Sequence, residues 1–493
     1  MKRESGILLP IFSLPSPYGI GCFSKEAYEF VDQLKEAGQS YWQILPLGPT
    51  SYGDSPYQSF STFAGNPYFI SLDELVEEGV LTREECDAAN FGRSRSTIDY
   101  AKLYKNRYPL LRKAYERSRV WENEDFLQFR RENGWWLRDY ALFVAVKDRF
   151  GGKAWTEWAE DIRLRWNNAM EYYQKELYYE IEFHEYLQYL FLRQWEKLKA
   201  YANSQGIRII GDIPIYVAMD SADTWANPEL FQLDQDNRPL AVAGCPPDGF
   251  SATGQLWGNP LYRWDYHRQQ GYSWWIRRLA YCYKLYDVVR IDHFRGFDEY
   301  YSIPYGDDTA VNGKWMPGPG MDLFRAIEAK LGRPAIIAED LGFLTPSVLQ
   351  LLKDSGFPGM KVLQFAFDAR ESSNYLPHTY PTNCVVYTGT HDNDTTRGWY
   401  HEVGKSARDF AKEYMCKERL DEDTLTKDFI AMAMSSVADL CVIPMQDYLN
   451  LGSEARINIP STLGGNWVWR MKKGQFDKET VKEIARVTEL YGR

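Results

Sequence analysis

The chain has 493 residues, and 44% of them are hydrophobic. It can therefore bury a large core without help from disulfides or a metal ion. Its 57 basic residues are outnumbered by 68 acidic ones, and the net charge of −11 argues against nucleic acid or an anionic membrane as a partner. A neutral ligand is compatible with this charge. The aromatic content of 16% suits a sugar, although most of these rings are expected in the core.

Seven cysteines lie scattered along the chain, and no two have the spacing C-x-x-C. This pattern indicates neither a zinc site nor a disulfide framework, and it fits reduced thiols in the cytoplasm. The apolar run 7–12 resembles part of a signal peptide, but Pro10 interrupts it and Glu4 lies in the basic part before it. Because no apolar run reaches about 18 residues, no membrane span is predicted, and we expect a cytoplasmic protein.

Short apolar runs alternate with amphipathic helical stretches, which is the pattern of βα units. In chain order, strands are predicted at 41–47, 67–72, 207–213, 287–291, 335–338, 362–367, 385–388 and 440–444. The run 67–72 carries the weakest strand pattern of these. Between 81 and about 206 the strand pattern disappears, and apolar residues recur at helical spacing, as at Leu137, Ala141 and Val144. We expect a helical insertion region at approximately 73–200, forming one wall of a cleft.

Three of the predicted strands run directly into acidic residues. The first ends at Asp292, with Arg290 on the same strand face. The second ends at Glu339 and Asp340, and the third at His391 and Asp392. Any single strand-end acid could simply cap a helix or face solvent. Three in succession, each beside a basic residue or another acid, predict a functional site.

The chemistry available to such acids is restricted. An arginine keeps a neighbouring carboxylate ionised, so that it can act as a nucleophile. A second carboxyl group, crowded by acidic neighbours, can keep its proton and serve as a general acid. Two such groups about 5 Å apart meet the needs of a retaining reaction at a glycosidic bond. A third acid can hold sugar hydroxyls.

These motifs resemble those of the 4-α-glucanotransferases, also called amylomaltases or disproportionating enzymes, which are relatives of the α-amylases. The resemblance runs nearly end to end. The matching segments are 47–58, 211–217, 246–260, 290–296, 338–342, 389–395 and 456–467. The segment 246–260 and the pair Asn466–Trp467 point to the transferases within the wider amylase clan. The resemblance implies one catalytic (β/α)8 TIM barrel domain over 1–493, with the helical insertion subdomain on its loop side and the acids after the fourth, fifth and seventh strands.

The resemblance also implies catalytic roles. Asp292 would be the nucleophile that forms a covalent glycosyl ester, and Glu339 the acid and base. Asp392 would hold sugar hydroxyls and distort the ring, with Asp394 as its competitor for that role. Arg290 would be the electrostatic partner of Asp292, a structural ion pair at the barrel rim, or both.

Further residues are expected to bind substrate. His293 and His391 are expected to contact glucose rather than fill the core, and Trp257, on a Gly- and Pro-punctuated loop, to cover the glucan rather than pack inside. Ser55 and Tyr57, in the loop after the first predicted strand, would contact sugar or order that loop. The complete predicted substrate-binding set is Tyr52, Ser55, Tyr57, Asp212, Gln255, Trp257, Arg290, His293, Asp340, His391 and Asn466.

The expected function is transfer of a segment of an α-1,4-glucan or maltooligosaccharide to the 4-hydroxyl of a glucose or glucan acceptor. No metal or cofactor is expected, because no third His or Cys completes a ligand cluster. One alternative is an α-amylase-type hydrolase with the same acids. Another is a non-catalytic glucan-binding protein on the same barrel, which Asn or Gln at 292 or 339 would have favoured.

Overall fold

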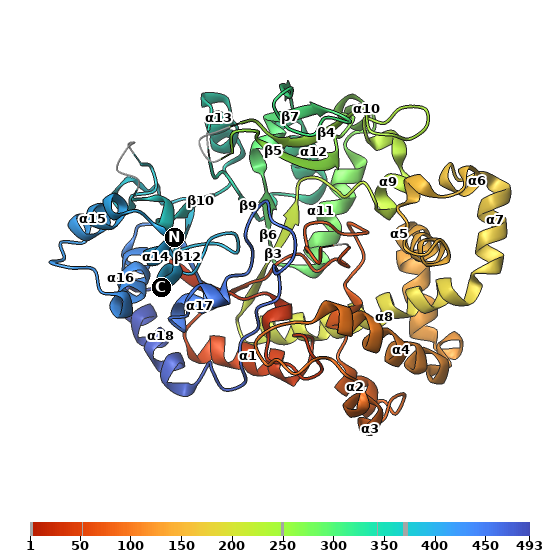
Figure 1. Ribbon diagram of the computed structural model, residues 1–493, viewed down its shortest axis with the longest axis horizontal. Helices are drawn as coiled ribbons and strands as arrows, with labels where there is room; N and C mark the ends of the chain where they lie inside the picture. Colours follow the sequence, from red (N-terminus) through yellow and green to blue (C-terminus); the bar gives the residue numbers. More distant parts are fainter. Residues whose placement is uncertain (1–2, 52, 248–250, 343, 368–372) are drawn as a thin grey trace.

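The computed structural model describes residues 3–51, 53–247, 251–342, 344–367 and 373–493. An eight-stranded parallel sheet lies at its centre, in the order β10-β11-β12-β1-β2-β3-β6-β9 (Figure 1). The two end strands, β9 and β10, approach each other: the Ala338 N–H at the end of β9 donates to the Pro358 carbonyl just before β10 at 2.9 Å. This nearly closed sheet confirms the predicted (β/α)8 barrel. Its strands are β1 Glu4–Leu8, β2 Tyr41–Gln43, β3 Arg208–Pro214, β6 Val288–Asp292, β9 Ile336–Ala338, β10 Gly359–Val362, β11 Cys384–Tyr387 and β12 Leu440–Pro444.

One predicted strand is wrong, and one real strand was missed. The segment 67–72 is a 3-10 turn, Pro67–Phe69, followed by the start of a helix. Asn66 and Ser71 cap these two elements by accepting backbone N–H groups, which is helix-start chemistry. The missing strand is β1, whose apolar residues belong to the run that was compared with a signal peptide. The loop of Ser55 and Tyr57 therefore follows the second strand rather than the first.

The remaining barrel strands lie near their predicted positions. β6, β9 and β11 are the fourth, fifth and seventh strands in chain order, as expected for those that end in acids. The sixth strand, β10, begins and ends earlier than the predicted 362–367, because Leu363–Phe365 turns into a 3-10 helix. The acids on three strands of one parallel sheet therefore reach the same end of the barrel.

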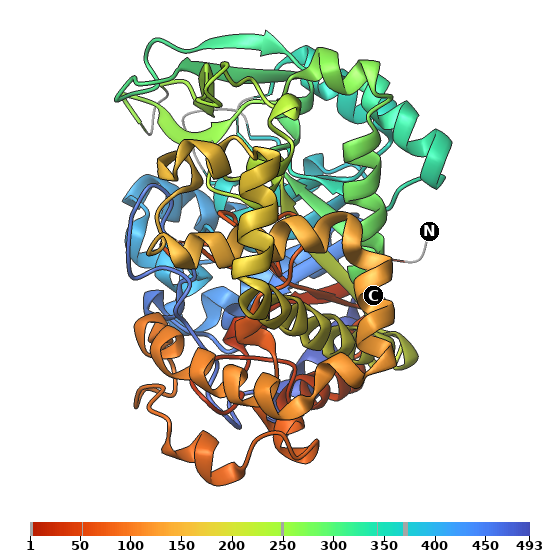
Figure 2. The same ribbon diagram turned by 90° about the vertical axis from the view of Figure 1, so that its right-hand side faces the viewer.

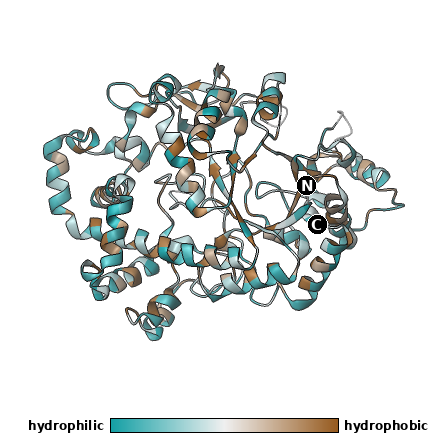
Figure 3. Cartoon of the chain, turned by 180° about the vertical axis from the view of Figure 1, so that it is seen from behind, coloured by the Kyte–Doolittle hydropathy of each residue, from teal (hydrophilic) through white to brown (hydrophobic). Residues whose placement is uncertain are grey.

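Helices surround the barrel, and the apolar colour in Figure 3 gathers on the central strands. Between β2 and β3 the chain forms α2 to α8, and Figure 2 shows these helices in front of the barrel. The helices are α1 Lys25–Glu36, α2 Leu72–Glu77, α3 Arg83–Ala88, α4 Tyr100–Ser118, α5 Glu124–Arg149, α6 Glu160–Arg163, α7 Asn167–Glu176, α8 Tyr178–Ser204, α9 Ala222–Ala226, α10 Trp264–Gln269, α11 Ser273–Leu285, α12 Met321–Leu331, α13 Pro346–Ser355, α14 Thr396–Glu402, α15 Lys405–Tyr414, α16 Glu422–Ser435, α17 Met445–Tyr448 and α18 Lys478–Leu490.

A second, antiparallel sheet is built from segments that follow β3 and β6, in the order β5-β4-β7-β8. Trp257 lies on its edge strand β5, so the expectation of a plain loop there is wrong. An edge strand tolerates the proline at position 260. Gly244 allows the close pairing, because a Cβ at that position would meet the Gln255 carbonyl oxygen at 2.1 Å. The strands are β4 Ala241–Cys245, β5 Gln255–Pro260, β7 Glu299–Pro304 and β8 Lys314–Pro317.

The seven cysteines are all free thiols. Within the described parts of the chain, no helix has the length and apolarity needed to cross a membrane.

Candidate active site

Arg290 links two carboxylates at the end of the fourth strand. Its guanidinium donates to both oxygens of Asp212, at 2.8 and 2.7 Å, and to Oδ1 of Asp292 at 2.9 Å. Arg290 and Asp212 are buried, whereas the Asp292 side chain keeps 33% of its exposure. Burial alone would lower the pKa of Arg290, but the charges of Asp212 and Asp292 raise it well above its usual value. Arg290 is thus a structural ion pair and the partner of Asp292 at once.

Glu339 follows the fifth strand and is held by two backbone N–H groups. His293 donates to Oε2 at 2.7 Å, and Leu341 donates to Oε1 at 2.9 Å. The enclosing protein and then the negative charge of Asp292 raise the pKa of Glu339 to about 8, although Arg290 and the two N–H groups act in the opposite direction. Glu339 is therefore protonated at neutral pH, while Asp292 is ion-paired.

The backbone of His293 is part of this arrangement. His293 adopts the left-handed conformation, with φ 59° and ψ 51°, directly after Asp292. This conformation is uncommon for a residue other than glycine. It turns the N–H of His293 toward the carboxylate of Glu339. The strained backbone therefore lies at His293, which follows Asp292 and donates to Glu339.

The seventh strand delivers two acids with different surroundings. The Asp392 side chain is 44% exposed, and Asn458 donates to its Oδ1 at 2.7 Å. Asp394 is buried and accepts from the Ser453 hydroxyl at 2.6 Å and from the Thr395 N–H at 2.7 Å. Asp394 is occupied in fixing the start of α14. Asp392 is the acid that remains open to a ligand.

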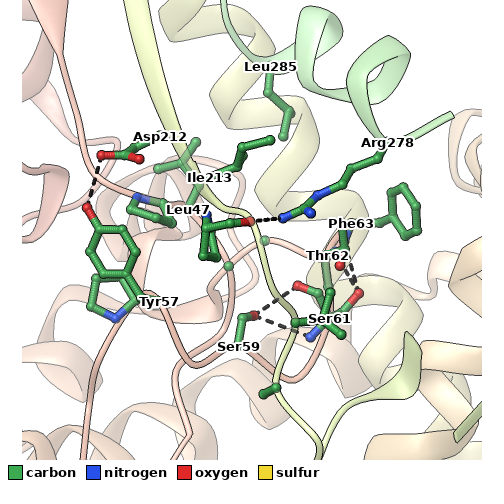
Figure 4. Close-up of a pocket in the computed structure, with 18 of the residues that line it drawn as sticks. Leu47, Tyr57, Ser59, Ser61, Thr62, Phe63, Asp212, Ile213, Arg278 and Leu285 are labelled. Atoms are coloured by element: carbon green, nitrogen blue, oxygen red, sulfur yellow. Dashed lines mark hydrogen bonds between the residues drawn. The ribbon is translucent and has the colours of Figure 1, made fainter. Parts of the chain in front are cut away.

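Tyr57 shows that these groups converge. Its hydroxyl donates to Oδ2 of Asp212 at 2.9 Å, the contact drawn in Figure 4. Its ring stacks on His391, with centroids 5.1 Å apart and planes 15° apart, and Trp467 lies 5.7 Å away. Burial and then the charge of Asp212 raise the pKa of Tyr57, with smaller contributions from Asp292 and Asp392. The phenol of Tyr57 therefore feels the charges of acids at the ends of three strands, β3, β6 and β11.

A cavity of about 50 Å³ lies beside Tyr57 and Asp212, between the loop after β2 and the end of β3 (Figure 4). Its lining includes Ser59, Ser61 and the buried Arg278. A volume of this size suits a few water molecules. The partly exposed carboxylates of Asp292 and Asp392 do not belong to the lining of this cavity.

Strand β5 carries an aromatic residue, Trp257, that contacts His293 next to Asp292. The Trp257 ring meets the His293 ring edge to face, with centroids 4.8 Å apart, and the indole N–H donates to Gln255 at 3.0 Å. Burial lowers the pKa of His293 to about 4, so its imidazole is neutral. Trp257 is partly exposed. It covers the imidazole next to Asp292 and keeps some surface for a ligand.

Other predicted binding residues are engaged within the protein. Ser55 accepts the Tyr57 N–H at 3.3 Å, and buried Asp340 accepts the Met360 N–H at 2.6 Å. Asn466 accepts the Ile459 N–H at 3.0 Å and donates back into its own loop. Tyr52 lies outside the described residues. A direct role of these four in substrate binding stays a prediction.

Two contacts to Asp392 were not foreseen. Arg456 donates to its main-chain carbonyl at 3.0 Å, and Asn458 holds its carboxylate. These residues lie 64 and 66 positions away along the chain. The segment 456–467 was singled out as a motif, but no periodicity in it indicates which residue reaches which acid.

Comparison with known proteins places this arrangement in a family. The sequence model described as 4-alpha-glucanotransferase matches residues 9–476. The 4-alpha-glucanotransferase of Clostridium butyricum is 51% identical over 485 residues, which are 98% of this chain and 99% of that protein. That of Thermus thermophilus is 48% identical, with 99% of each chain covered. The structure of the amylomaltase from Streptococcus agalactiae in complex with acarbose superposes with a TM-score of 0.96 at 44% identity, covering 100% of both chains. The chain therefore belongs to the 4-alpha-glucanotransferase family of enzymes.

Proposed function

We propose that the chain transfers segments of α-1,4-glucans and maltooligosaccharides by a retaining, two-step reaction at Asp292. The observation that carries this proposal is the contrast between the two principal acids. Asp292 is paired with Arg290, whereas the pKa of Glu339 is raised to about 8. A nucleophile and a proton donor with these properties are what cleavage of a glycosidic bond requires.

In the first step, Glu339 gives its proton to the oxygen that leaves from C1 of the cleaved glucose. The bond from C1 to that oxygen breaks as a carboxylate oxygen of Asp292 bonds to C1. The reducing-side fragment leaves with a new 4-hydroxyl, and the rest of the glucan is held as an ester on Asp292. Glu339 is now ionised, and the N–H groups of His293 and Leu341 stabilise its charge.

In the second step, the 4-hydroxyl of an acceptor glucose or glucan replaces the departed fragment. Glu339 takes the proton of this hydroxyl, and the acceptor oxygen bonds to C1 as the ester bond to Asp292 breaks. Two inversions restore the α-configuration. Asp392 contributes to both steps by holding hydroxyls of the distorted sugar ring, where positive charge develops.

The surrounding residues would bind and enclose the glucan. We propose that Trp257, His293 and His391 contact the sugar at the cleaved bond, and that the helices over approximately 73–200 form one wall of the cleft within a single catalytic domain. These steps use carboxyl groups alone and call for no metal or cofactor. A cytoplasmic enzyme of maltooligosaccharide, starch or glycogen metabolism fits the seven free thiols.

Incubation of the purified protein with maltotriose tests the proposal. A transferase gives a ladder of shorter and longer oligomers while the number of reducing ends stays constant. A rising number of reducing ends would identify an α-amylase-type hydrolase, and an unchanged substrate would identify a binding protein. The Asp292→Asn variant is the control, because it removes the nucleophile and should lower turnover by about 10⁴-fold or more without unfolding the chain.

A further inference from the structure

Asp392 is held from outside the barrel. The segment 456–458 follows the last barrel strand and makes three hydrogen bonds to the loop that carries this acid, with a fourth inside the segment. Asn458 donates its side-chain amide to Oδ1 of Asp392 at 2.7 Å and its backbone N–H to the His391 carbonyl at 3.1 Å. Arg456 donates to the main-chain carbonyls of Asp392 at 3.0 Å and of Asn458 at 2.9 Å. Backbone and side chain of Asp392 are thus fixed by the same short segment.

The hydrogen bond from Asn458 occupies only one of the two carboxylate oxygens of Asp392. A carboxylate has two oxygens and rotates readily about its last side-chain bond. The amide occupies Oδ1, on the side where Nε2 of His391 also lies, 3.5 Å away. Among the described residues, no side chain or backbone N–H donates to Oδ2 of Asp392, whereas Asn458 donates to Oδ1. Fixing one oxygen therefore turns the other toward a bound sugar.

The segment is itself well anchored, which allows it to fix another group. The Trp467 N–H closes it by donating to the Ile457 carbonyl at 2.7 Å. The Tyr100 hydroxyl donates to the Trp467 carbonyl at 2.8 Å, and the Ile98 N–H donates to Val468 at 2.8 Å. The chain near α4 thus holds the segment that holds Asp392. Asn458 presents its amide from a supported position.

From this geometry we infer that Asn458 is a positioning residue for the transfer reaction, which acts by aiming Asp392 at the sugar ring in the transition state. The inference rests on the proposed function, in which Asp392 is the acid that holds the sugar hydroxyls. Asn458 acts through Asp392 and needs no contact with the glucan. Its effect should therefore fall on turnover rather than on binding of the unreacted glucan.

The first test is Asn458→Ala in the full chain. Misplacing a group in the transition state by a fraction of an ångström to 1 Å costs up to about 100-fold, so kcat on maltotriose should fall roughly 10- to 100-fold while KM changes little. The matched control is Asn312→Ala, which breaks an exposed Asn–Asp pair of 3.0 Å to Asp307. The control should keep full activity. Full activity in Asn458→Ala would overturn the inference.

A double-mutant cycle separates this inference from the proposed function. With maltotriosyl fluoride as an activated donor, residual turnover is measured for Asp392→Ala, for Asn458→Ala and for both together. If Asn458 acts through Asp392, its replacement causes no further loss once Asp392 is absent. An equal loss in both backgrounds would overturn the inference. Normal turnover of Asp392→Ala would instead contradict the proposed role of Asp392.

The isosteric variant Asn458→Asp gives a readout that a loosened fold would not give. It places a second carboxyl group against Oδ1 of Asp392, where two negative charges repel at neutral pH. As the pH falls, one shared proton restores a hydrogen bond between the two groups. Activity relative to the unmodified enzyme should therefore be low at neutral pH and should rise toward acid pH. A constant ratio across the pH range would contradict direct action on Asp392.

Discussion

The acids at the three strand ends differ in their partners, and these partners decide which acid is paired with a cation and which keeps its proton. Arg290 pairs with two carboxylates, those of the buried Asp212 and the partly exposed Asp292, so that neither lacks a counter-charge. An unpaired buried carboxylate would cost several kcal/mol, about 3–5 when one partner of such a pair is removed. Among the described residues, no cation forms an ion pair with the neighbouring Glu339, and burial raises its pKa to about 8, so it keeps its proton. The difference between Asp292 and Glu339 arises because the guanidinium of Arg290 donates to Asp292 and Asp212.

Replacement of Asp392 should affect turnover, whereas replacement of Asp394 should affect stability. Asp392→Asn should lower turnover by about 10³-fold or more with little change in unfolding, because Asp392 is partly exposed and open to the sugar. Asp394→Asn should lower the free energy of unfolding by about 1–3 kcal/mol, since Asp394 is buried and accepts two hydrogen bonds. Steady-state kinetics and denaturant melts of both variants check this. Equal loss of turnover with unchanged stability would restore Asp394 as a candidate.

The raised pKa of Glu339 predicts a basic limit to activity. Its proton is needed to release the leaving fragment, and the folded protein loses that proton as the pH rises through about 8. The rate of donor cleavage, measured as kcat/KM, should therefore be high below this pH and fall above it. A rate that is flat from pH 7 to 9 would contradict the assignment. As a control, Asp292→Asn removes a charge that raises the pKa, so ¹³C-carboxyl NMR should show Glu339 titrating at lower pH.

At the scale of elements, the small sheet β5-β4-β7-β8 extends from the loops after β3 and β6. It places Trp257 over His293, which directly follows Asp292. The segment 456–467, near the C-terminus, holds Asp392. Two elements outside the barrel thus complete a site whose acids come from the barrel itself.

The Trp257→Ala variant tests the small sheet as a cover. Loss of the indole removes a large apolar surface beside the ester, so water should compete better with the acceptor. We expect slower transfer and a higher ratio of hydrolysis to transfer, measured as new reducing ends against oligomer redistribution from maltotriose. Trp315→Ala, on strand β8 of the same sheet, is the matched control and should leave the ratio unchanged. An unchanged ratio in Trp257→Ala would assign Trp257 to packing alone.

The elements that adjacent residues in the chain identify were predicted from the sequence. The elements that depend on tertiary packing were missed. The strands that end in acids were found because an apolar run and a carboxylate are adjacent in the chain. β1 was missed because its apolar residues run on to Pro10 and beyond, so that the segment was compared with a signal peptide instead of a strand. β5 was taken for a loop because glycine weakens a strand and proline is tolerated mainly at a sheet edge, and no local pattern shows that β5 is an edge strand. The contact of Asn458 with Asp392 depends on tertiary packing, so only the structure gives it.

For the whole molecule, we predict that activity is independent of metal ions. The proposed reaction uses carboxyl groups throughout, and within the described residues no group of three or more His, Cys, Asp or Glu side chains is arranged to hold an ion. Exhaustive dialysis against EDTA should leave transfer from maltotriose and the melting temperature unchanged. A calcium-dependent α-amylase treated in parallel shows that the chelation worked. Loss of activity that calcium or zinc restores would reveal a site that this prediction excludes.

The order of the barrel strands has a consequence for biosynthesis. β1 lies between β2 and β12, and its partner residues Glu4 and Leu440 are 436 positions apart. At about 5–20 residues per second, the ribosome takes about 20–90 s to make the last strand after the first. During this interval the free edge of β1 has no partner and can pair wrongly with other chains. A chaperone that covers this edge should therefore reduce mispairing of the nascent chain. The yield of folded protein should depend on chaperones more strongly than the stability of the folded protein suggests.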